Sequence, residues 1–315
     1  MKENKKMNNT KFIMAKGTMT IETFMDVLKD ALASHLPDCI LEVQEAQKNN
    51  GVILHGIRIM EPECNIVPCI YLDDAFIDYQ DGRDFQEIVT AVAENYKQNR
   101  PVFGFDATFI TDYERVKERI CFKVINTDLN KELLADVPHV PFHDLSVVFY
   151  VLIDSIPGQN ASIMVHNSHM ADWEVDTDEL FKTAKSNTQR ILSGKVMSMR
   201  DLIAGVPNNL AEDRMPEAEN CDMYVATNRE SVNGAAVFLY DSLLSAFADK
   251  IGRDFYIIPS SIHELIFLPD DLDMEPERIK QMVCEVNEAC VDPEEVLSNN
   301  VYHYMKETGL VEMVA

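Results

Sequence analysis

The chain has 315 residues, of which 28 are Lys or Arg and 53 are Asp or Glu, and its formal net charge is −25. Apolar residues make up 46% and charged residues 26% of the chain, a balance that is typical of a folded soluble protein and excludes a disordered or fibrous one. A chain this acidic repels nucleic-acid phosphates and anionic lipids, so we expect no generic nucleic-acid binding. The length exceeds that of a usual single-core domain, which predicts two to three lobes.

Residues 1–17 are basic, with five Lys and one Glu. We expect a disordered leader over residues 1–18, and the alternative is a tail that docks on an acidic partner or on this protein's own acidic body. The apolar part of the leader, Phe12 to Ala15, is too short for a secretory signal. The longest apolar run, Leu145 to Ile153, falls well short of the roughly 20 residues of a membrane-spanning helix. These features predict a cytoplasmic protein with no membrane partner.

The seven cysteines are scattered along the chain, odd in number and without a C-x-x-C pair. A disulfide scaffold or a zinc ribbon would show paired spacing. We therefore expect reduced thiols, none of them in a structural disulfide, and we assign no cofactor.

A first α+β unit is expected over residues 19–105. Thr20 is suited to cap a helix whose apolar residues recur at helical spacing. Asn50-Gly51 is a typical hairpin turn, and Asp84 with Glu87 has the spacing of a capping box at the start of a second helix. The expected strands are Ile40–Val43, Val52–Ile59 and Ile66–Leu72.

A central unit is expected over residues 106–205, after the break at Arg100-Pro101. The run Leu145 to Ile153 is β-branched and aromatic enough for a central, buried strand. Asp176 and Glu179 have the spacing that opens a helix. The other expected elements are helices at Asp112–Arg119, Lys131–Ala135 and Ser198–Ile203, and strands at Cys121–Ile125 and Ala161–Val165.

Residues 206–220 are rich in Asn and Pro and form the predicted linker to a C-terminal unit, residues 221–315. In that unit Asn233-Gly234 favours a hairpin between strands at Met223–Ala226 and Ala235–Tyr240. The next elements are a helix from Asp241 to Gly252 and strands at Phe255–Ile258 and Leu265–Leu268.

The C-terminal end is expected to be helical. One helix spans Met274–Cys290, with four apolar residues facing inward: Ile279, Met282, Val283 and Val286. Asp292-Pro293 then opens a last helix to about Lys306. The three units together predict an α+β fold with a mixed β-sheet core flanked by helices.

The most enzyme-like segment holds Ser261, His263 and Glu264 between two expected strands. A hydrolase nucleophile needs a base within hydrogen-bond reach and a third group that orients the base, and these groups normally come from separate segments. Ser261 and Glu264 also have the spacing of a capping box at the start of a helical turn. We favour the capping box, and a catalytic role of the three residues is the alternative.

Four histidines form two close pairs, His139 with His143 and His166 with His169. If the strands beginning at residues 145 and 161 form a hairpin, His143 and His166 lie toward the same end of it. Imidazoles with a nearby carboxylate are ligands for zinc or iron, so the four histidines are candidate metal ligands. Hydrogen-bonded loop histidines are the simpler interpretation, because Pro141 prevents a helix between the first two.

Two further segments are polar. Residues 126–130, Asn-Thr-Asp-Leu-Asn, favour a turn in which Asx side chains bond the backbone, and they lack the pattern of a calcium loop. The stretch from Glu264 to Ser298 holds eleven carboxylates against Arg278 and Lys280. We expect that stretch to form a solvated face, and a face that docks a partner or mimics DNA is the alternative.

Five strings of sequence act as family markers: residues 126–130, 137–150, 223–228, 234–236 and 254–264. With them, about residues 20–310 of the chain resemble a family known only as a domain of unknown function, found in anaerobic gut Firmicutes. That family is distantly similar to another uncharacterised group of bacillus proteins. The resemblance implies a bacterial, cytoplasmic accessory protein, and it carries over no activity and no site.

Two functions remain open. The first is a non-catalytic binding or adaptor protein whose acidic surface meets another protein. The second is a hydrolase or a metal-dependent enzyme built on the four histidines or on Ser261 and His263. The chain holds no P-loop, no G-x-G-x-x-G motif, no G-x-S-x-G elbow, no H-E-x-x-H motif and no kinase motif set, which favours the first.

Overall fold

The computed structural model describes residues 19–62, 67–100, 107–153, 161–204, 223–270 and 275–315. The expected leader and the expected linker therefore lie outside the described residues. The chain divides into two compact units. Unit 1 comprises Met1–Lys48 and Ile53–Asp106, and unit 2 comprises Asn49–Val52 and Ala107–Ala315.

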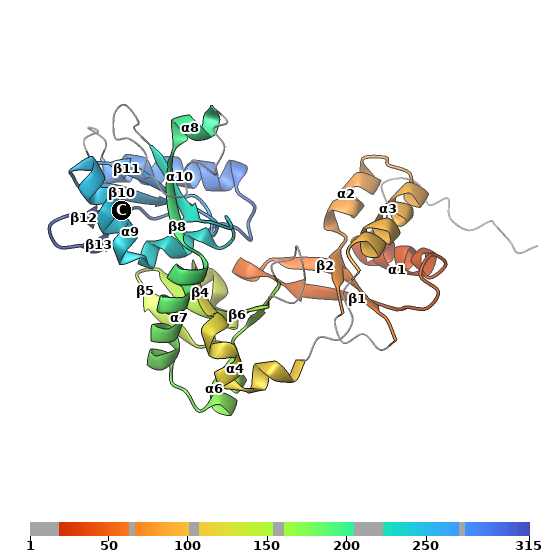
Figure 1. The fold of residues 1–315 in the computed structure, drawn as a ribbon. Coiled ribbons are helices and arrows are strands. Elements are labelled where there is room, and N and C mark those ends of the chain that lie inside the picture. The colour runs from red at the N-terminus through yellow and green to blue at the C-terminus, as the bar shows by residue number, and fades with distance from the viewer. Residues whose placement is uncertain (1–18, 63–66, 101–106, 154–160, 205–222, 271–274) are drawn as a thin grey trace, which may run out of the picture. The chain divides into compact units, whose positions relative to one another are not determined.

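Unit 1 is a three-stranded antiparallel sheet in the order β1-β2-β3, packed against helices (Figure 1). The N-cap predictions are confirmed, because Thr20 accepts a hydrogen bond from Thr23 N and Asp84 accepts from Gln86 N and Glu87 N. Its elements are α1 (Ile21–Leu32), β1 (Ile40–Gln47), β2 (Ile53–Met60), β3 (Cys69–Tyr71), α2 (Asp73–Gln80) and α3 (Phe85–Gln98).

The core of unit 1 is made by one face of the sheet and by residues at helical spacing on α1 and α3. Its fully buried members include Phe24, Leu28, Ile57 and Val89. Burying an aliphatic or aromatic side chain of this size contributes about 1.5–3 kcal/mol, so these contacts supply most of the stability of the unit.

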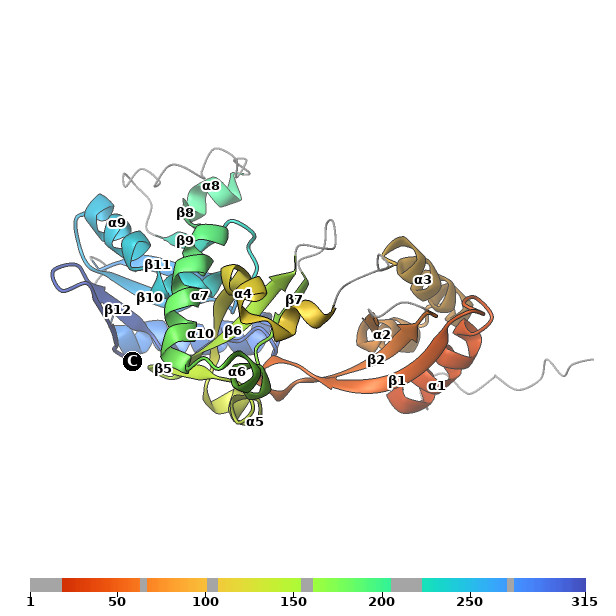
Figure 2. The ribbon, with the colours of Figure 1, turned by 60° about the horizontal axis from the view of Figure 1, so that its bottom comes forward.

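Unit 2 contains two antiparallel sheets (Figure 2). In the first, β6 pairs with β4 along one edge and with β5 and then β7 along the other. The second has six strands in the order β13-β12-β10-β11-β9-β8. The α+β prediction is confirmed, and every strand pair in the described part of the chain is antiparallel rather than mixed.

The elements of unit 2 follow in chain order. The first half contains η1 (Asn49–Gly51), η2 (Ala107–Thr111), α4 (Tyr113–Val116), η3 (Lys117–Arg119), β4 (Ile120–Asn126), η4 (Asp128–Asn130), α5 (Lys131–Leu134), β5 (His139–Phe142), β6 (Leu145–Ile153), β7 (Ala161–Met164), α6 (Asn167–Trp173) and α7 (Thr177–Ile191). The second half contains β8 (Gly194–Ser198), α8 (Met199–Ile203), β9 (Tyr224–Asn228), η6 (Gly234–Leu239), α9 (Asp241–Ile251), β10 (Phe255–Pro259), β11 (Leu265–Pro269), α10 (Pro276–Cys290), β12 (Tyr302–Met305) and β13 (Leu310–Met313).

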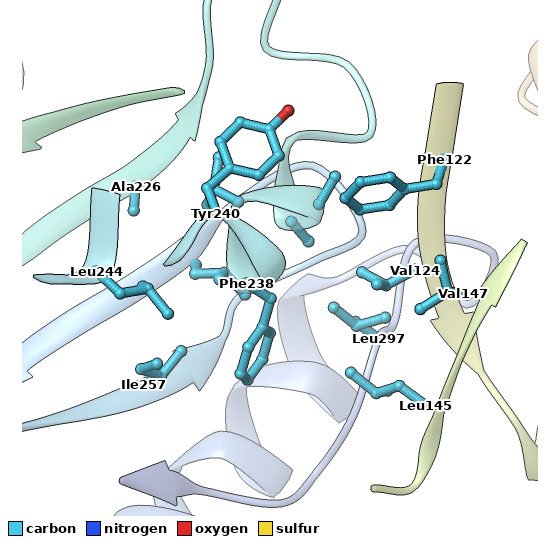
Figure 3. Packing of buried hydrophobic residues seen from close by; sticks show 14 of the residues in the cluster. Phe122, Val124, Leu145, Val147, Ala226, Phe238, Tyr240, Leu244, Ile257 and Leu297 are labelled. Atoms are coloured by element: carbon cyan, nitrogen blue, oxygen red, sulfur yellow. The ribbon is translucent and has the colours of Figure 1, made fainter. Parts of the chain in front are cut away.

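One hydrophobic cluster joins both sheets of unit 2, and η6 lies inside it. Figure 3 shows Phe238 of η6 between Ile257 of the six-stranded sheet and Leu145 of the other sheet. The expected central and C-terminal lobes therefore share one core, and they lie in one unit. The expected boundary at residues 105–106 lies next to the boundary between the two units.

The predicted strand at Ala235–Tyr240 is wrong, because Gly234–Leu239 forms a buried 3-10 helix. A Cβ atom on Gly234 would lie 2.0 Å from Thr227 Oγ1 and 2.3 Å from the carbonyl oxygen of His263. Only glycine fits there, and Ala235 and Ala236 are small enough for the helical turn to enter the core, where both are fully buried.

The predicted helix from Asp292 to Lys306 is also wrong. Tyr302–Met305 is strand β12, which pairs with β10 and β13. Tyr302 and Tyr304 are buried on one face of the sheet, and this alternation overrides the helix-start signal of Asp292-Pro293. A six-stranded sheet is thereby completed from the C-terminal end of the chain.

Candidate functional site

The segment from Ser261 to Glu264 is a tight connection between β10 and β11. Ser261 N donates to the carbonyl oxygen of Glu264 at 3.2 Å, and His263 N donates to Ser261 Oγ at 3.0 Å. No helical turn begins here, so the predicted capping box is wrong. Pro259 and Leu265 are paired, and the five residues between them form bends rather than a turn of helix.

The imidazole of His263 is held from both sides. Its Nδ1 accepts a hydrogen bond from Asn233 N at 3.1 Å, and its Nε2 lies 3.4 Å from Glu295 Oε1. Ser261 Oγ accepts a hydrogen bond from the backbone N–H of His263 rather than donating one to its ring, while the Glu264 carboxylate lies 3.5 Å from Ser260 Oγ. A hydroxyl that is to be activated by a base needs that base in contact, and here both nitrogens are engaged elsewhere.

The four candidate metal-ligand histidines are spread over β5 and the start of α6. His139 lies opposite Val148, and His143 follows the end of β5 with a φ of 55°. The backbone of Val165 bonds to the carbonyl of Phe149, which places His166 beside the start of β5. The expected hairpin of β6 and β7 forms, and on its open side the backbone of His166 comes beside the start of β5, where His139 lies, rather than beside the end of β5, where His143 lies.

At the start of α6 the second histidine pair forms a capping arrangement. His166 N donates to His169 Nδ1 at 3.0 Å, and His166 Nδ1 lies 2.7 Å from Asp136 Oδ2. The His169 ring stacks on Trp173 with a centroid distance of 5.6 Å, and Trp173 Nε1 donates to the carbonyl of Ile110. Burial, and then the neighbouring His166, lower the pKa of His169. His169 therefore remains neutral and keeps its acceptor nitrogen.

Among the residues that the structure describes, no group of three or more His, Cys, Asp and Glu side chains could hold a metal ion. The predicted Asx turn at residues 126–130 is confirmed, because Asn126 Oδ1 accepts from Leu129 N at 2.9 Å. Asn130 exchanges two hydrogen bonds with Asn50 of η1, at 2.8 and 2.9 Å. These polar side chains bond one another and the backbone, and they present no free ligand set.

A second polar cluster surrounds Asp144, in the turn between β5 and β6. Its carboxylate accepts hydrogen bonds from Ser298 Oγ at 2.6 Å, from Asn300 Nδ2 at 2.9 Å and from the Tyr302 hydroxyl. Burial, and then the Asp144 charge, raise the pKa of Tyr302, so its hydroxyl remains a donor. This Asp144 cluster ties the first sheet of unit 2 to the segment that precedes β12.

Unit 1 has a cavity of about 360 Å³ near the ends of α1 and α3. Glu61 Oε1 accepts from the Tyr96 hydroxyl at 2.5 Å, and Glu61 Oε2 accepts from Arg100. The bond from Arg100 lowers the pKa of Glu61, while burial raises the pKa of Tyr96 and of the Cys39 thiol. Glu61, Tyr96 and Arg100 therefore satisfy one another at this cavity, and the Cys39 thiol is a poor nucleophile.

The remaining candidate is the acidic stretch, and its central element is α10. Ile279 and Val283 are buried against Tyr256 and Leu268 of the six-stranded sheet. Met282 and Val286 were expected to face inward with them, and this prediction is wrong: they are 51% and 53% exposed.

We define the α10 outer face by six residues with exposed side chains: Arg278, Met282, Glu285, Val286, Glu288 and Ala289. Met282 and Val286 lie one turn apart, with Glu285 and Glu288 beside them. An exposed apolar strip with a charged rim is typical of an interaction surface. The spacing of the four apolar residues gave no signal for this face, because positions i, i+3, i+4 and i+7 are also those of a single core-facing stripe.

The whole arrangement can now be compared with known proteins. The model of a family of unknown function (DUF5688) matches residues 21–306. The chain belongs to this family. No curated protein and no solved structure matches the chain.

Two further expectations bear on the chemistry of the molecule. Five cysteines in the described part of the chain are unpaired: Cys39, Cys69, Cys121, Cys284 and Cys290. The other two lie outside the described residues. Within the described ranges, no helix combines the length and the apolar character needed to cross a membrane.

Proposed function

We propose that this protein is a non-catalytic, cytoplasmic binding or adaptor protein, and that the α10 outer face binds a partner segment that is basic and partly apolar. The observation that carries the proposal is the exposure of Met282 and Val286 on a helix whose opposite side is well packed. Full burial of an apolar side chain of this size contributes about 1.5–3 kcal/mol, and because each of the two is already about half buried, a partner that covers them gains roughly 1 kcal/mol from each.

The negative charges around the apolar strip of Met282 and Val286 favour a cationic partner. Glu285 and Glu288 flank the strip, Glu275 and Glu277 precede it, and Arg278 is the one cation among the six residues of the face. The chain as a whole carries −25. A cationic segment is therefore attracted from a distance, and the flexible Met282 side chain adapts to its apolar residues.

The enzymatic alternative receives less support from the geometry. Both ring nitrogens of His263 have partners, and His166 and His169 cap α6. Each of these groups has a structural task that accounts for its position. The α10 outer face has no such task, which is why we place the function there.

Site-specific photo-crosslinking tests the proposal. A photoreactive amino acid replaces Met282 in one variant and Leu310, which is 58% exposed, in a control variant of the full chain. In a native lysate we expect an adduct at position 282 whose crosslinked peptide is rich in Lys and Arg, and none at position 310. Adding Glu285→Lys and Glu288→Lys should abolish the adduct. Equal adducts at both positions, or an adduct that survives the charge reversal, would contradict the proposal.

A further inference from the structure

Strand β1 lies at the edge of the three-stranded sheet of unit 1 (Figure 2). We propose that β1 pairs antiparallel with β1 of a second copy of the chain, so that two three-stranded sheets join into one sheet. The partner is then the same protein, and the surface that it contacts is the outer edge of β1. This interaction is separate from the α10 outer face, which belongs to unit 2.

The hydrogen bonds of β2 show which backbone groups of β1 point outward. In an antiparallel sheet the N–H and C=O of one residue point to the same neighbouring strand. Ile59 N donates to the carbonyl oxygen of Pro68 at 3.1 Å, so the odd-numbered residues of β2 bond toward β3. The even-numbered residues of β2 bond toward β1, and the register pairs them with the even-numbered residues of β1. The backbone groups of Leu41, Val43 and Glu45 therefore face the outer edge.

This edge is long and uncovered. In the part of the chain that the structure describes, the outward backbone groups of residues 41–45 make no other hydrogen bond. The other long edge strand, β4, is covered by α7, because Thr188 Oγ1 accepts from Phe122 N at 3.0 Å. The remaining edge strands, β3, β5, β7, β8 and β13, have three to five residues each. β1 has eight residues without Pro or a bulge, and it therefore presents a regular template for a further strand.

Antiparallel pairing centred on Val43 uses all the outward groups. Val43 then lies opposite Val43 of the second copy, and Leu41 lies opposite Glu45 of the second copy. Each of these pairs exchanges two backbone hydrogen bonds, because the groups of odd-numbered residues face each other across the edge. The self-pairing is symmetric, so each copy satisfies the edge of the other.

The side chains fit the same register. Directly opposite residues share a face of the sheet. Ile40, which is 65% exposed, comes to lie opposite Ala46 of the second copy, and Val43 packs beside its own counterpart. Glu42 lies opposite Gln44, so no two carboxylates are directly opposite. The pairing covers an exposed apolar side chain and opposes no like charges.

The two neighbouring registers fit less well. A shift by two residues in one direction places the two Glu42 carboxylates directly opposite each other, which is destabilising. A shift in the other direction places Glu45 opposite Val43 and moves Ile40 beyond Ala46. Only the register centred on Val43 keeps apolar side chains together and carboxylates apart.

Sedimentation equilibrium of the full chain between about 1 and 200 µM tests the proposal. We expect a monomer–dimer equilibrium within this range, because the pairing of two short strands buries less surface than a standard interface. Raising the ionic strength from about 0.05 M to 0.3 M should strengthen the dimer several-fold, since two chains of charge −25 repel each other less when the Debye length shortens.

Two substitutions of the exposed Glu45 isolate the backbone bond. Glu45→Pro removes the outward N–H, and it spares the bonds to β2 because even-numbered residues make them. The dimer loses this bond twice by symmetry, so its dissociation constant should rise at least about tenfold. Glu45→Ala removes the same carboxylate, keeps the N–H and should dimerise at least as well as the unaltered chain. If circular dichroism shows that Glu45→Pro does not fold, disulfide trapping decides alone.

Disulfide trapping tests the register. Glu42 of one copy and Gln44 of the other form a non-hydrogen-bonded pair, whose Cα atoms lie about 4.5 Å apart and within reach of a disulfide. An equimolar mixture of Glu42→Cys and Gln44→Cys chains should give at least about tenfold more covalent dimer than either chain alone, because identical positions lie diagonally and too far apart. Mass spectrometry of the linked peptides distinguishes this bond from bonds of the native cysteines.

A chain that stays monomeric at about 200 µM would overturn the proposal and leave the edge to a segment of another protein. Equal dissociation constants of Glu45→Pro and Glu45→Ala would overturn it too, and so would a covalent dimer as abundant in either chain alone as in the mixture. The proposed function is tested separately. Met282→Asp with Val286→Asp should leave the dimer unchanged, and loss of the dimer should leave the crosslink at position 282 in place.

Discussion

The Asp144 cluster and the α10 outer face are opposite cases within unit 2. At Asp144, polar side chains are drawn away from water, and each finds a partner within the chain. On α10, the apolar side chains of Met282 and Val286 are about half exposed to water, whereas Ile279 and Val283 on the other side of the helix are buried against the sheet. The polar groups around Asp144 have a task in the fold, whereas the α10 outer face is the surface at which we propose that a partner binds.

Among the single substitutions, Asp144→Ala should have the largest effect on stability. The substitution leaves the donors of Ser298, Asn300 and Tyr302 without their shared acceptor, at a cost of about 3 kcal/mol. For a unit of this size the thermal midpoint should fall by roughly 6–12 °C. Tyr302→Phe removes one donor only and should cost about 1 kcal/mol. If Asp144→Ala melts like the unaltered chain, the cluster does not hold the segment before β12 in place.

Ser261→Ala should have the next largest effect. The hydroxyl closes the β10–β11 turn by accepting the N–H of His263, a bond worth about 1 kcal/mol. The expected fall in midpoint is about 2–4 °C, and it should be measured by circular dichroism. His263→Ala should leave the fold intact and spare any binding activity. Unchanged stability with loss of an activity in both variants would instead reveal a Ser/His site.

Elements with strong local signals could be predicted from the sequence. α1 and α3 have side-chain caps and apolar residues at helical spacing, and β6 was predicted with its observed bounds because nine residues form one apolar run. Helix η6 and strand β12 could not be predicted in the same way. Their structure depends on contacts across the core, such as the approach of Gly234 to Thr227 and the pairing of Tyr304 with Phe255.

The sequence predicted the region of the α10 outer face but not which of its residues are exposed. The acidic stretch marked the region, but periodicity put Met282 and Val286 on the same side as Ile279 and Val283. Which pair packs depends on the orientation of the helix on Tyr256 and Leu268, and a helix-spacing pattern does not contain that information. Which of the four histidines are neighbours could not be predicted either, because this depends on the register between β5, β6 and β7.

The start of α6 should respond to pH. The pKa of His169 is lowered in the folded state, so the unfolded chain takes up the proton first as the pH falls below about 6.5. The contribution of His169 to stability is therefore present above the unfolded pKa, is lost as the pH falls toward the folded pKa, and is constant below it. The ring is partly exposed, so we expect a smaller effect than that of Ser261→Ala.

Thermal midpoints measured from pH 8 to pH 5 in His169→Gln test this sign. Gln at this position can still accept the N–H of His166, but it does not titrate in this range. The variant should therefore lose less stability on acidification than the unaltered chain. A steeper loss in His169→Gln would reverse the assignment of His169 as a neutral acceptor.

Substitutions of the exposed apolar residues on the α10 outer face should have the smallest effect on stability, in contrast to Asp144→Ala. Met282→Asp with Val286→Asp replaces two side chains that lie on the exposed side of the helix and outside the buried clusters, so the midpoint should change by no more than about 1–2 °C. The inward pair is the matched control: Ile279→Asp with Val283→Asp puts two charges into the contact with Tyr256 and Leu268 and should unfold the unit or lower its midpoint by more than 10 °C. Two double substitutions on one helix, identical in chemistry, thus separate the packed side from the outer face. A large loss of stability from the outer pair would mean that Met282 and Val286 belong to the core, and the face would then not be available to a partner.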